Sequence, residues 1–339
     1  MNHAFWVHLA MALGATTVAA PNAAAQPPDG TISSFTGNLA SSACINPEGL
    51  TVDYRGNFYV GSASTKPTGA ICQFTSQGVL AKVIRIPAGA SGLVSLLGIR
   101  FEGEHTVFAL DFADSLAHKG TVNGRVIAVD TDSGSVTTIA TGFSFPNGIA
   151  EDPERNLYIS DSLQGTITRM GRDGTNKTVW ASGPLLAGNS KTPLPLGANG
   201  IQFDRFFQNM YVANTSYRRI IRIPVGPGWT AGTAVVFADG PTIDASQSTT
   251  KSLMNPDGLT LDLFGNIYVA ANAAGEIQVL SPAGQLVARY GDTTLPVNFP
   301  ASPLFVGNQL YFTNVSLHNG GVNSSVAVLQ NDLPGSPPP

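Results

Sequence analysis

The sequence predicts an all-β protein, a six-bladed β-propeller whose four-stranded antiparallel blades surround a central channel. Its composition gives the first reason, because 37 glycines and 23 prolines among 339 residues favour many short strands and turns over long helices. The second reason is a phrase that occurs six times: a small residue, an alternating strand, a polar turn, and a β-branched and aromatic strand. Units of roughly 40–50 residues with four short strands each are typical of propeller blades.

The six phrases follow one another along most of the chain. They read "NPEGLTVDYRGNFYVGS", "LLGIRFEGEHTVFALD", "FPNGIAEDPERNLYISD", "GANGIQFDRFFQNMYVAN", "NPDGLTLDLFGNIYVAA" and "FPASPLFVGNQLYFTN". The small residue before each first strand is Gly49, Gly98, Gly148, Gly200, Gly258 and Ala301, at spacings of 43 to 58 residues. Residues 30–330 are therefore predicted to form a single propeller domain.

The two ends of the domain are expected to meet, since propellers avoid a free sheet edge. The segment "GTISSFTG" at residues 30–37 is predicted to supply a strand beside the one that contains "SVAVLQ". Residues 331–339 end in "LPGSPPP", which has no strand or helix pattern, and are expected to be a disordered tail.

Residues 1–25 are predicted to be a secretory signal peptide, because an apolar run precedes Ala23, Ala24 and Ala25. A membrane anchor is the alternative, but the run is short for a span and His8 interrupts it. Cys44 and Cys72 could form one disulfide in an oxidising compartment, or remain a thiol pair. The expected location is secreted or periplasmic, with no membrane span after signal cleavage.

The charge of the chain argues against a nucleic-acid partner. Only 12% of residues are charged, the formal net charge is −4, the sequence pI is about 5.7, and Lys and Arg form no cluster. The expected partner is a small-molecule substrate, while the sequence does not indicate an oligomeric state.

One position of the repeat points to chemistry, because it directly precedes the small residue and should lie at one mouth of the channel. Across the six blades it reads Glu48, Leu97, Asn147, Asn199, Asp257 and Pro300. Four of these residues carry side-chain oxygens and none is His or Cys, which suits Ca²⁺ better than zinc. Two carboxylates meeting in a channel would also repel each other unless a cation joined them. The alternative is that E-G, N-G and D-G pairs only form turns.

A second set of acids should lie at the opposite mouth. Asp53, Asp152, Asp204 and Asp262 each come just before the turn between the first two strands of a blade. Aspartate stabilises tight turns by accepting hydrogen bonds from its own backbone, so these residues are predicted to be structural.

The phrases "NPEGLTVD", "FPNGIA", "GANGIQFD" and "NPDGLTLD" resemble the calcium-dependent six-bladed propellers of the gluconolactonase/senescence-marker family, and more distantly diisopropyl fluorophosphatase and the paraoxonases. The resemblance implies that Glu48, Asn147, Asn199 and Asp257 hold a catalytic calcium ion and that the substrate is a lactone or related ester. Asp257 would then be the general base or the nucleophile. Glu48 would be mainly a ligand, and the two asparagines would also orient substrate.

Other residues are expected around this site. His118 and His318 follow the second strands of blades two and six and could contact substrate, although a loop histidine is more often a plain surface residue. Leu97 and Pro300 would give the channel mouth an apolar wall. Asp161 and Asn214 end the second strands of blades three and four, where they could hydrogen-bond to the metal ligands or cap the next turn.

Two other functions fit a propeller. A non-enzymatic propeller resembling the NHL-repeat class would bind a macromolecule and use the cation structurally, but it would need a basic or aromatic-rich open face. A metal-free enzyme resembling strictosidine synthase would leave the set of Asn147, Asn199 and Asp257 unexplained.

Overall fold

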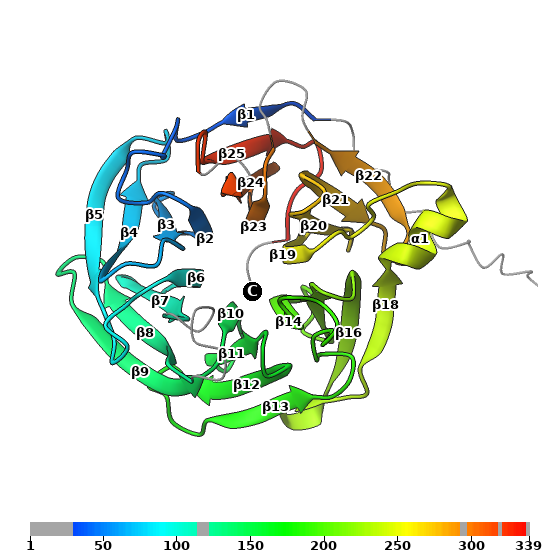
Figure 1. Cartoon of the computed structure of the whole chain (residues 1–339), viewed down its shortest axis with the longest axis horizontal. Coiled ribbons are helices and arrows are strands. Elements are labelled where there is room, and N and C mark those ends of the chain that lie inside the picture. The colour runs from blue at the N-terminus through cyan, green and yellow to red at the C-terminus, as the bar shows by residue number, and fades with distance from the viewer. Residues whose placement is uncertain (1–29, 114–121, 292–296, 318–320, 337–339) are drawn as a thin grey trace, which may run out of the picture.

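A computed structural model describes residues 30–113, 122–291, 297–317 and 321–336. The described strands form six antiparallel sheets arranged as blades around a central channel, which confirms the predicted six-bladed propeller (Figure 1). Each blade begins with its innermost strand at the channel and proceeds outward, and successive blades follow one another around the ring.

The strands are distributed over the blades as follows. Blade one contains β2 (Pro47–Val52), β3 (Phe58–Ser62), β4 (Thr68–Phe74) and β5 (Leu80–Pro87), and blade two contains β6 (Leu96–Glu102), β7 (Thr106–Asp111), β8 (Gly124–Asp130) and β9 (Val136–Phe143). Blade three contains β10 (Pro146–Glu151), β11 (Asn156–Asp161), β12 (Thr166–Gly171) and β13 (Thr178–Ser182). Blade four contains β14 (Ala198–Phe203), β15 (Asn209–Asn214) and β16 (Arg219–Gly226), with β17 (Thr230–Ala231) and β18 (Val235–Asp239) both pairing with β16.

The remaining elements complete the ring. Blade five contains β19 (Pro256–Leu261), β20 (Ile267–Ala271), β21 (Glu276–Leu280) and β22 (Leu286–Tyr290), and blade six contains β23 (Pro300–Val306), β24 (Gln309–Asn314), β25 (Ser325–Gln330) and β1 (Ile32–Ser34). The 3₁₀ turn η1 (Pro227–Trp229) joins β16 to β17, and helix α1 (Gly240–Gln247) connects blades four and five. Asp239 begins α1 by accepting a hydrogen bond from the Thr242 amide at 3.0 Å.

Burial differs systematically between inner and outer strands, and this explains their sequences. The second strand of blade one, β3, is buried at every residue, because it lies between an inner and an outer strand and between two neighbouring blades. The outermost strand β5 mixes buried and exposed residues, and β9 is at least partly exposed at every residue except Phe143. The uninterrupted apolar and aromatic runs therefore mark second strands, and the mixed runs mark the rim.

The ring closes as the sequence predicted. Strand β1 pairs antiparallel with β25, with Ile32 opposite Leu329, so the start of the domain provides the outer strand of the last blade. In Figure 1 these two strands lie side by side at the top of the ring. A blade built from both ends of the chain leaves no open sheet edge between blades six and one.

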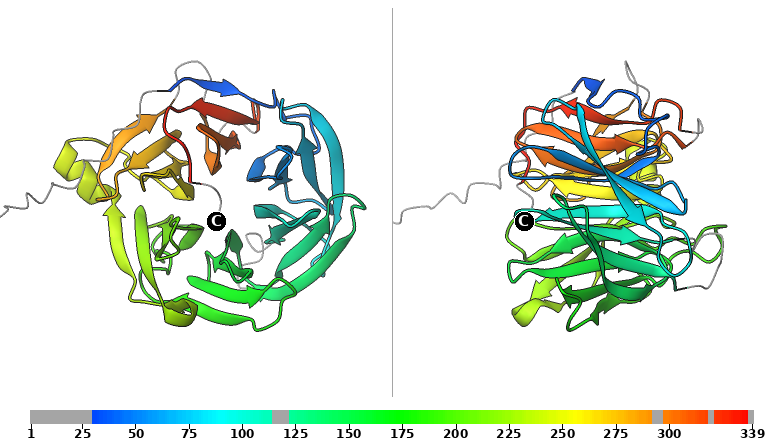
Figure 2. Two further views of the ribbon diagram at one scale, coloured as in Figure 1. Left: turned by 180° about the vertical axis from the view of Figure 1, so that it is seen from behind. Right: turned by 90° about the vertical axis from the view of Figure 1, so that its left-hand side faces the viewer.

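The chain after β25 turns inward across one end of the channel. The Leu263 amide donates to the Pro334 carbonyl at 3.0 Å, and the Ser336 amide donates to the Leu261 carbonyl at 2.9 Å. The red segment that follows β25 accordingly runs toward the centre of the ring (Figures 1 and 2). Residues 331–336, which the sequence assigns to a disordered tail, thus make backbone contacts with the propeller, while 337–339 lie outside the described residues.

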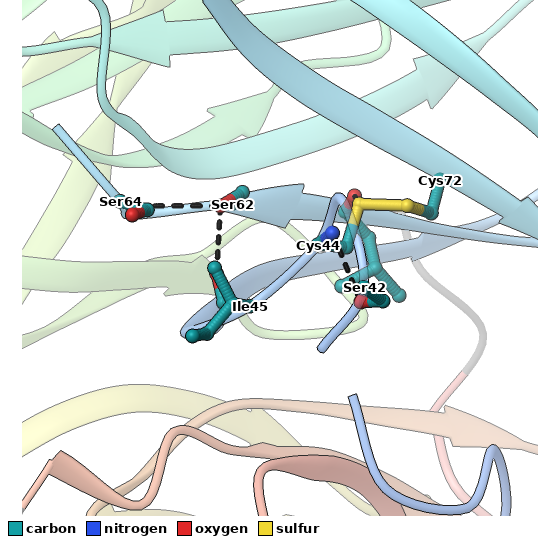
Figure 3. Close-up of a disulfide and its surroundings, with 7 residues drawn as sticks. Ser42, Cys44, Ile45, Ser62, Ser64 and Cys72 are labelled. Atoms are coloured by element: carbon teal, nitrogen blue, oxygen red, sulfur yellow. Dashed lines mark hydrogen bonds between the residues drawn. A yellow bond between two sulfur atoms is a disulfide. The ribbon is translucent and has the colours of Figure 1, made fainter. Parts of the chain in front are cut away.

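Blade one contains a disulfide between Cys44 and Cys72, the pairing that the sequence left open. It links the segment that enters β2 to strand β4, and both cysteines are fully buried (Figure 3). Close to this bond, the Ser62 hydroxyl donates to the Ile45 carbonyl at 2.7 Å. The approach to β2, and with it the position of Glu48, is held by a covalent and a hydrogen-bonded contact.

In the described part of the chain, no helix has the length and apolar character needed to cross a membrane. The predicted signal peptide, residues 1–25, lies outside the described residues.

Candidate metal centre

A β-bulge at the start of each inner strand creates the candidate site. In blade one Pro47 is opposite Ser62 but Leu50 is opposite Val60, so Glu48 and Gly49 together face the single residue Gly61. The same register shift occurs at the equivalent place in the other five blades. The acid–glycine and Asn–Gly pairs therefore belong to bulged strands, and the simple turn interpretation does not apply.

In blades one to five, the glycine of the bulge is required by the neighbouring blade. A Cβ atom on Gly49 would lie 2.2 Å from the Leu97 carbonyl oxygen, and one on Gly200 would lie 2.4 Å from the Asp257 carbonyl oxygen. The small residue thus lets one inner strand approach the backbone of the next candidate ligand. This contact sets the spacing of the residues around the channel mouth.

Blade six departs from the prediction by one residue. Pro300 is opposite Asn314 and Pro303 is opposite Phe312, so Ala301 occupies the position that Glu48 has in blade one. The sequence analysis had placed Pro300 there, because "FPASP" contains no glycine to fix the alignment. Ala301 has a fully buried methyl side chain and offers no ligand atom, so the correction leaves the set of donors unchanged.

The four candidate ligands come together as predicted. Glu48, Asn147, Asn199 and Asp257 all line one cavity of about 300 Å³, which is the central channel. Their exposed fractions are 8%, 6%, 3% and 6%, so the polar ends of these side chains are largely removed from water. Buried polar groups in proteins normally have hydrogen-bond partners.

Several of these polar atoms have none. Within the described part of the chain, Glu48 Oε2 and Asn199 Oδ1 are buried and have no hydrogen-bond partner, and the same holds for Oδ1 of the neighbouring Asn272. Leaving such an atom unsatisfied costs about 1–3 kcal/mol, and more for a charged group. Three unsatisfied oxygens close to a pair of acids indicate that the site is built for something that supplies positive charge or hydrogen-bond donors.

The electrostatics of the two acids lead to the same conclusion. Burial raises the pKa of Glu48 well above its usual range, and the charge of Asp257 raises it further. Burial also raises the pKa of Asp257 to about 6, although the amides of Asn272 and Asn199 oppose this rise. Both carboxylates are thus costly to ionise without a compensating cation.

The donor set is one that calcium accepts. Across the described ranges, no three His, Cys, Asp or Glu side chains gather as a metal-binding group. The centre instead offers two carboxylates and two amide side chains, and these are oxygen ligands of the kind that Ca²⁺ takes. The unpartnered Glu48 and Asn199 oxygens fit this assignment.

Two residues of the site were not predicted from the sequence. Asn272 Nδ2 donates to Asp257 Oδ2 at 3.1 Å, and Asn199 Nδ2 donates to Thr215 Oγ1 at 2.9 Å. The two residues are Asn272, directly after the second strand β20, and Thr215, directly after the second strand β15. A comparison of this position across the repeat could have found them, since it is polar only in blades three, four and five.

Asp161 and Asn214 make the contacts of loop caps. Asp161 accepts hydrogen bonds from the Ser144 and Phe145 amides, and also from the turn that follows β11. Asn214 Nδ2 donates to the carbonyls of Leu185 and Ala187. Of the two roles expected for these residues, the described contacts match capping.

Leu97 lies in an apolar cluster at the same face. It is buried with Phe112 and Phe145, whose ring centroids are 4.6 Å apart. Leu97 is not among the described residues that line the channel cavity, so the apolar wall expected from it stays a prediction. His118 and His318 lie outside the described residues.

Comparison with known proteins adds a family. Residues 193–316 match the SMP-30/Gluconolactonase/LRE-like region. The matched segment contains Asn199 and Asp257 and confirms the resemblance to the gluconolactonase family there. The "Putative sugar lactone lactonase" of Rhizobium meliloti (strain 1021) is 31% identical over 109 residues, which is 32% of this chain and 34% of that protein. The similarity thus spans about a third of that relative's length.

Solved structures extend the likeness of fold to almost the whole chain. A gluconolactonase from Xanthomonas campestris superposes with a TM-score of 0.62 at 14% identity, covering 91% of each chain. The calcium-binding protein regucalcin from Agrobacterium tumefaciens superposes with a TM-score of 0.60 at 15% identity, covering 90% of this chain and 95% of the other. At such identities the likeness shows the fold alone.

Proposed function

We propose that this protein is a calcium-dependent hydrolase of a lactone or related ester. The observation that carries the proposal is the pair of unpartnered buried oxygens, Glu48 Oε2 and Asn199 Oδ1, in the same channel mouth as Asp257. A site that only stabilised the fold would be expected to satisfy these atoms within the chain. Unsatisfied donors and acceptors at a cavity mouth are typical of sites that bind a ligand.

The proposed cation would be held by the side-chain oxygens of Glu48, Asn147, Asn199 and Asp257. When bound, calcium acts as a Lewis acid that polarises the substrate carbonyl and stabilises the negative charge that develops on its oxygen. The two asparagines are neutral, so they can bind the ion without adding to the repulsion between the carboxylates. They would also orient the substrate.

Asp257 is the residue proposed to carry the chemistry. As a general base it would take a proton from water while the water oxygen attacks the carbonyl carbon, after which the ester C–O bond breaks and the alkoxide leaving group is protonated. As a nucleophile its own oxygen would attack, and water would hydrolyse the resulting acyl-enzyme. The hydrogen bond from Asn272 Nδ2 to Asp257 Oδ2 holds the carboxylate in one orientation in either case.

The comparisons support the reaction class. The matched family region, the named lactonase and the named gluconolactonase all point to lactone hydrolysis, and the regucalcin neighbour is described as calcium-binding. The matched segment begins at residue 193, after the last strand of blade three, so calcium and the roles of Glu48 and Asn147 rest on the geometry above.

The substrate would contact both polar and apolar groups. Leu97, Phe112 and Phe145 provide an apolar cluster at the same face as the four donors, which suits a partly hydrophobic lactone. We also propose that His118 and His318, which follow β7 and β24 in the sequence, contact the substrate.

Export of the protein is part of the proposal. The disulfide between Cys44 and Cys72 is a bond that persists in oxidising compartments, in agreement with the signal peptide expected at residues 1–25. These two features support the proposed secreted or periplasmic location.

The test is hydrolysis of a panel of lactones and aryl esters, with the calcium content measured before and after exhaustive chelation. We expect about one tightly bound calcium per chain and activity that disappears on chelation and returns with added calcium. Bound calcium without turnover of any substrate would favour a binding propeller, and absence of calcium would contradict the metal centre. A single turnover in ¹⁸O-labelled water tests the nucleophilic role: if water attacks the Asp257 carboxyl carbon of the acyl-enzyme, the first product carries ¹⁶O from Asp257, whereas a general base gives a product labelled with ¹⁸O.

A further inference from the structure

One position of the repeat forms a polar arc beside the candidate ligands. The residue directly after the second strand is Ser162, Thr215 or Asn272 in blades three, four and five, and Ala63, Phe112 or Val315 in blades one, two and six. Ser162, Thr215 and Asn272 are all buried, with exposed fractions of 0%, 7% and 5%. The blades with a polar residue here are those that supply Asn147, Asn199 and Asp257.

The arc connects each blade to the ligand of the next. Ser162 Oγ donates to the Ala198 carbonyl at 2.7 Å, and Thr215 Oγ1 donates to the Pro256 carbonyl at 2.9 Å. These carbonyls belong to the residues immediately before Asn199 and Asp257. The hydroxyl in one blade therefore fixes the backbone from which the next candidate ligand projects.

Thr215 has a second contact that Ser162 lacks. Its Oγ1 accepts a hydrogen bond from Asn199 Nδ2 at 2.9 Å, while Asn199 Oδ1 is buried and has no partner. A carboxamide can present either its oxygen or its nitrogen to a site, since the two ends have nearly the same shape. The bond to Thr215 uses one of the two Nδ2 hydrogens, and with the nitrogen turned toward Thr215 the oxygen is left for the site.

We propose that Thr215 is a positioning residue, which turns the Asn199 amide so that its oxygen faces the cation and couples it to the strand that carries Asp257. This inference rests on the calcium centre proposed above. Thr215 is not one of the four ligands, but its hydroxyl determines that Asn199 presents an oxygen and not a nitrogen to the cation. Partners that orient a metal ligand typically contribute 10- to 100-fold to metal affinity.

The experiment compares Thr215→Val with Thr215→Ser in the full-length protein. Valine keeps the shape but removes both hydrogen bonds, whereas serine keeps the hydroxyl. Calcium is first removed from each protein with a chelator and is then titrated back in a calorimeter. The calcium affinity is expected to be about 10- to 100-fold weaker for T215V and nearly unchanged for T215S. Thr168→Val is the matched control, because Thr168 is a similarly buried threonine on β12, and it should bind calcium like the wild type.

A second readout does not depend on the metal. In ¹⁵N spectra of the calcium-free protein, the side-chain amide protons of Asn199 should exchange slowly in the wild type and T215S, and faster in T215V. Thr215→Ala replaces T215V if the valine variant does not fold.

The possible outcomes distinguish a failure of the role proposed for Thr215 from a failure of the proposed calcium centre. Equal calcium affinity in the wild type and T215V would overturn the role of Thr215 while leaving the metal centre in place. If the wild type binds no calcium, both the metal centre and the positioning role are wrong. Unchanged exchange of the Asn199 amide in T215V would show that the hydrogen bond does not hold this side chain.

Discussion

Glu48 and Asp53 lie at opposite ends of β2, and both are 8% exposed, yet their surroundings differ completely. Asp53 accepts hydrogen bonds from the Arg55 and Asn57 amides, each at 2.8 Å, and from the Asn57 side chain and the Tyr59 hydroxyl. Glu48 Oε2 is buried without any partner. Burial therefore does not distinguish a structural acid from a ligand in this propeller, whereas hydrogen-bond satisfaction does.

The contrast recurs at the two ends of β19. Asp262 accepts from the Phe264 and Asn266 amides, each at 2.9 Å, and from the Asn266 side chain at 2.7 Å. Asp257 accepts a hydrogen bond from the Asn272 amide at 3.1 Å, and it shares the channel mouth with the Glu48 and Asn199 oxygens that have no partner among the described residues. The mouth near Asp262 is thus closed by internal bonds and by residues 331–336, and the mouth near Asp257 has the unsatisfied groups.

The largest effect is expected from Asp257→Asn. The change removes the proposed base or nucleophile but keeps the shape, so kcat/KM for a lactone substrate should fall by about 10²- to 10⁴-fold while the fold remains. Asp262→Asn is the matched control at the other end of the same strand and should keep the activity of the folded protein. Steady-state kinetics on both variants measure the difference. Full activity in D257N would contradict the distinction between the two acids.

Next in size is the effect of filling a bulge. Gly200→Ala would place a Cβ 2.4 Å from the Asp257 carbonyl oxygen, so backbone must move, at a cost of about 3 kcal/mol of folding free energy. Gly103 lies in a turn near the other mouth, and a Cβ there would contact no other atom. Gly103→Ala should therefore cost only about 1–2 kcal/mol of folding free energy, because alanine disfavours the φ of +66°. Denaturant unfolding measures both. Equal costs would mean that blade contact does not explain the glycines at the ligand end.

The calcium-free protein should also show an unusual pH dependence. The pKa of Asp257 is raised from 3.8 to about 6, so this carboxyl ionises at a higher pH in the folded state than in the unfolded chain. The associated stability is present below about pH 4 and is lost as the pH rises through about 6, by about 3 kcal/mol. Urea unfolding in chelator from pH 4 to 7, compared with D257N, measures this loss. A wild-type profile parallel to that of D257N would contradict the raised pKa.

The smallest effect is expected at a satisfied acid. Asp152 bonds to the Asn156 amide at 2.9 Å, to the Tyr158 hydroxyl at 3.1 Å and to Arg169 at 3.1 Å. Asp152→Asn should reduce the free energy of unfolding by about 1–3 kcal/mol, because it leaves buried donors without an acceptor. Calcium affinity and kcat/KM should not change. A loss of calcium affinity in D152N would show that the two mouths are not independent.

The sequence was a good guide to the parts of the molecule that repeat. Six similar phrases predicted the blades, the closing strand β1 and the position of Glu48, Asn147, Asn199 and Asp257, because each innermost strand follows the same local pattern. The alignment was wrong in blade six, where the bulge has Ala301 and Ser302 in place of a ligand and glycine. A phrase without its glycine does not show where the bulge falls.

Other features could not be predicted because they depend on contacts between distant residues. Thr215 and Asn272 stand out in the repeat as polar residues, but their bonds to Asn199 and Asp257 appear only in the structure. The contact of the chain end with Leu261 and Leu263 involves main-chain groups and carries no side-chain signal. Hydrogen bonds of this kind depend on tertiary packing rather than on local pattern.

The most direct test of the account is calcium binding by two variants of one strand, Glu48→Gln and Asp53→Asn. Both changes neutralise an equally buried acid, so a general effect of charge or folding would alter both variants alike. Calorimetry on chelated protein is expected to show one calcium bound by the wild type and D53N, and affinity at least about 100-fold weaker in E48Q, a loss of about 3 kcal/mol. Binding by E48Q as tight as that of the wild type would contradict the assignment of the metal centre.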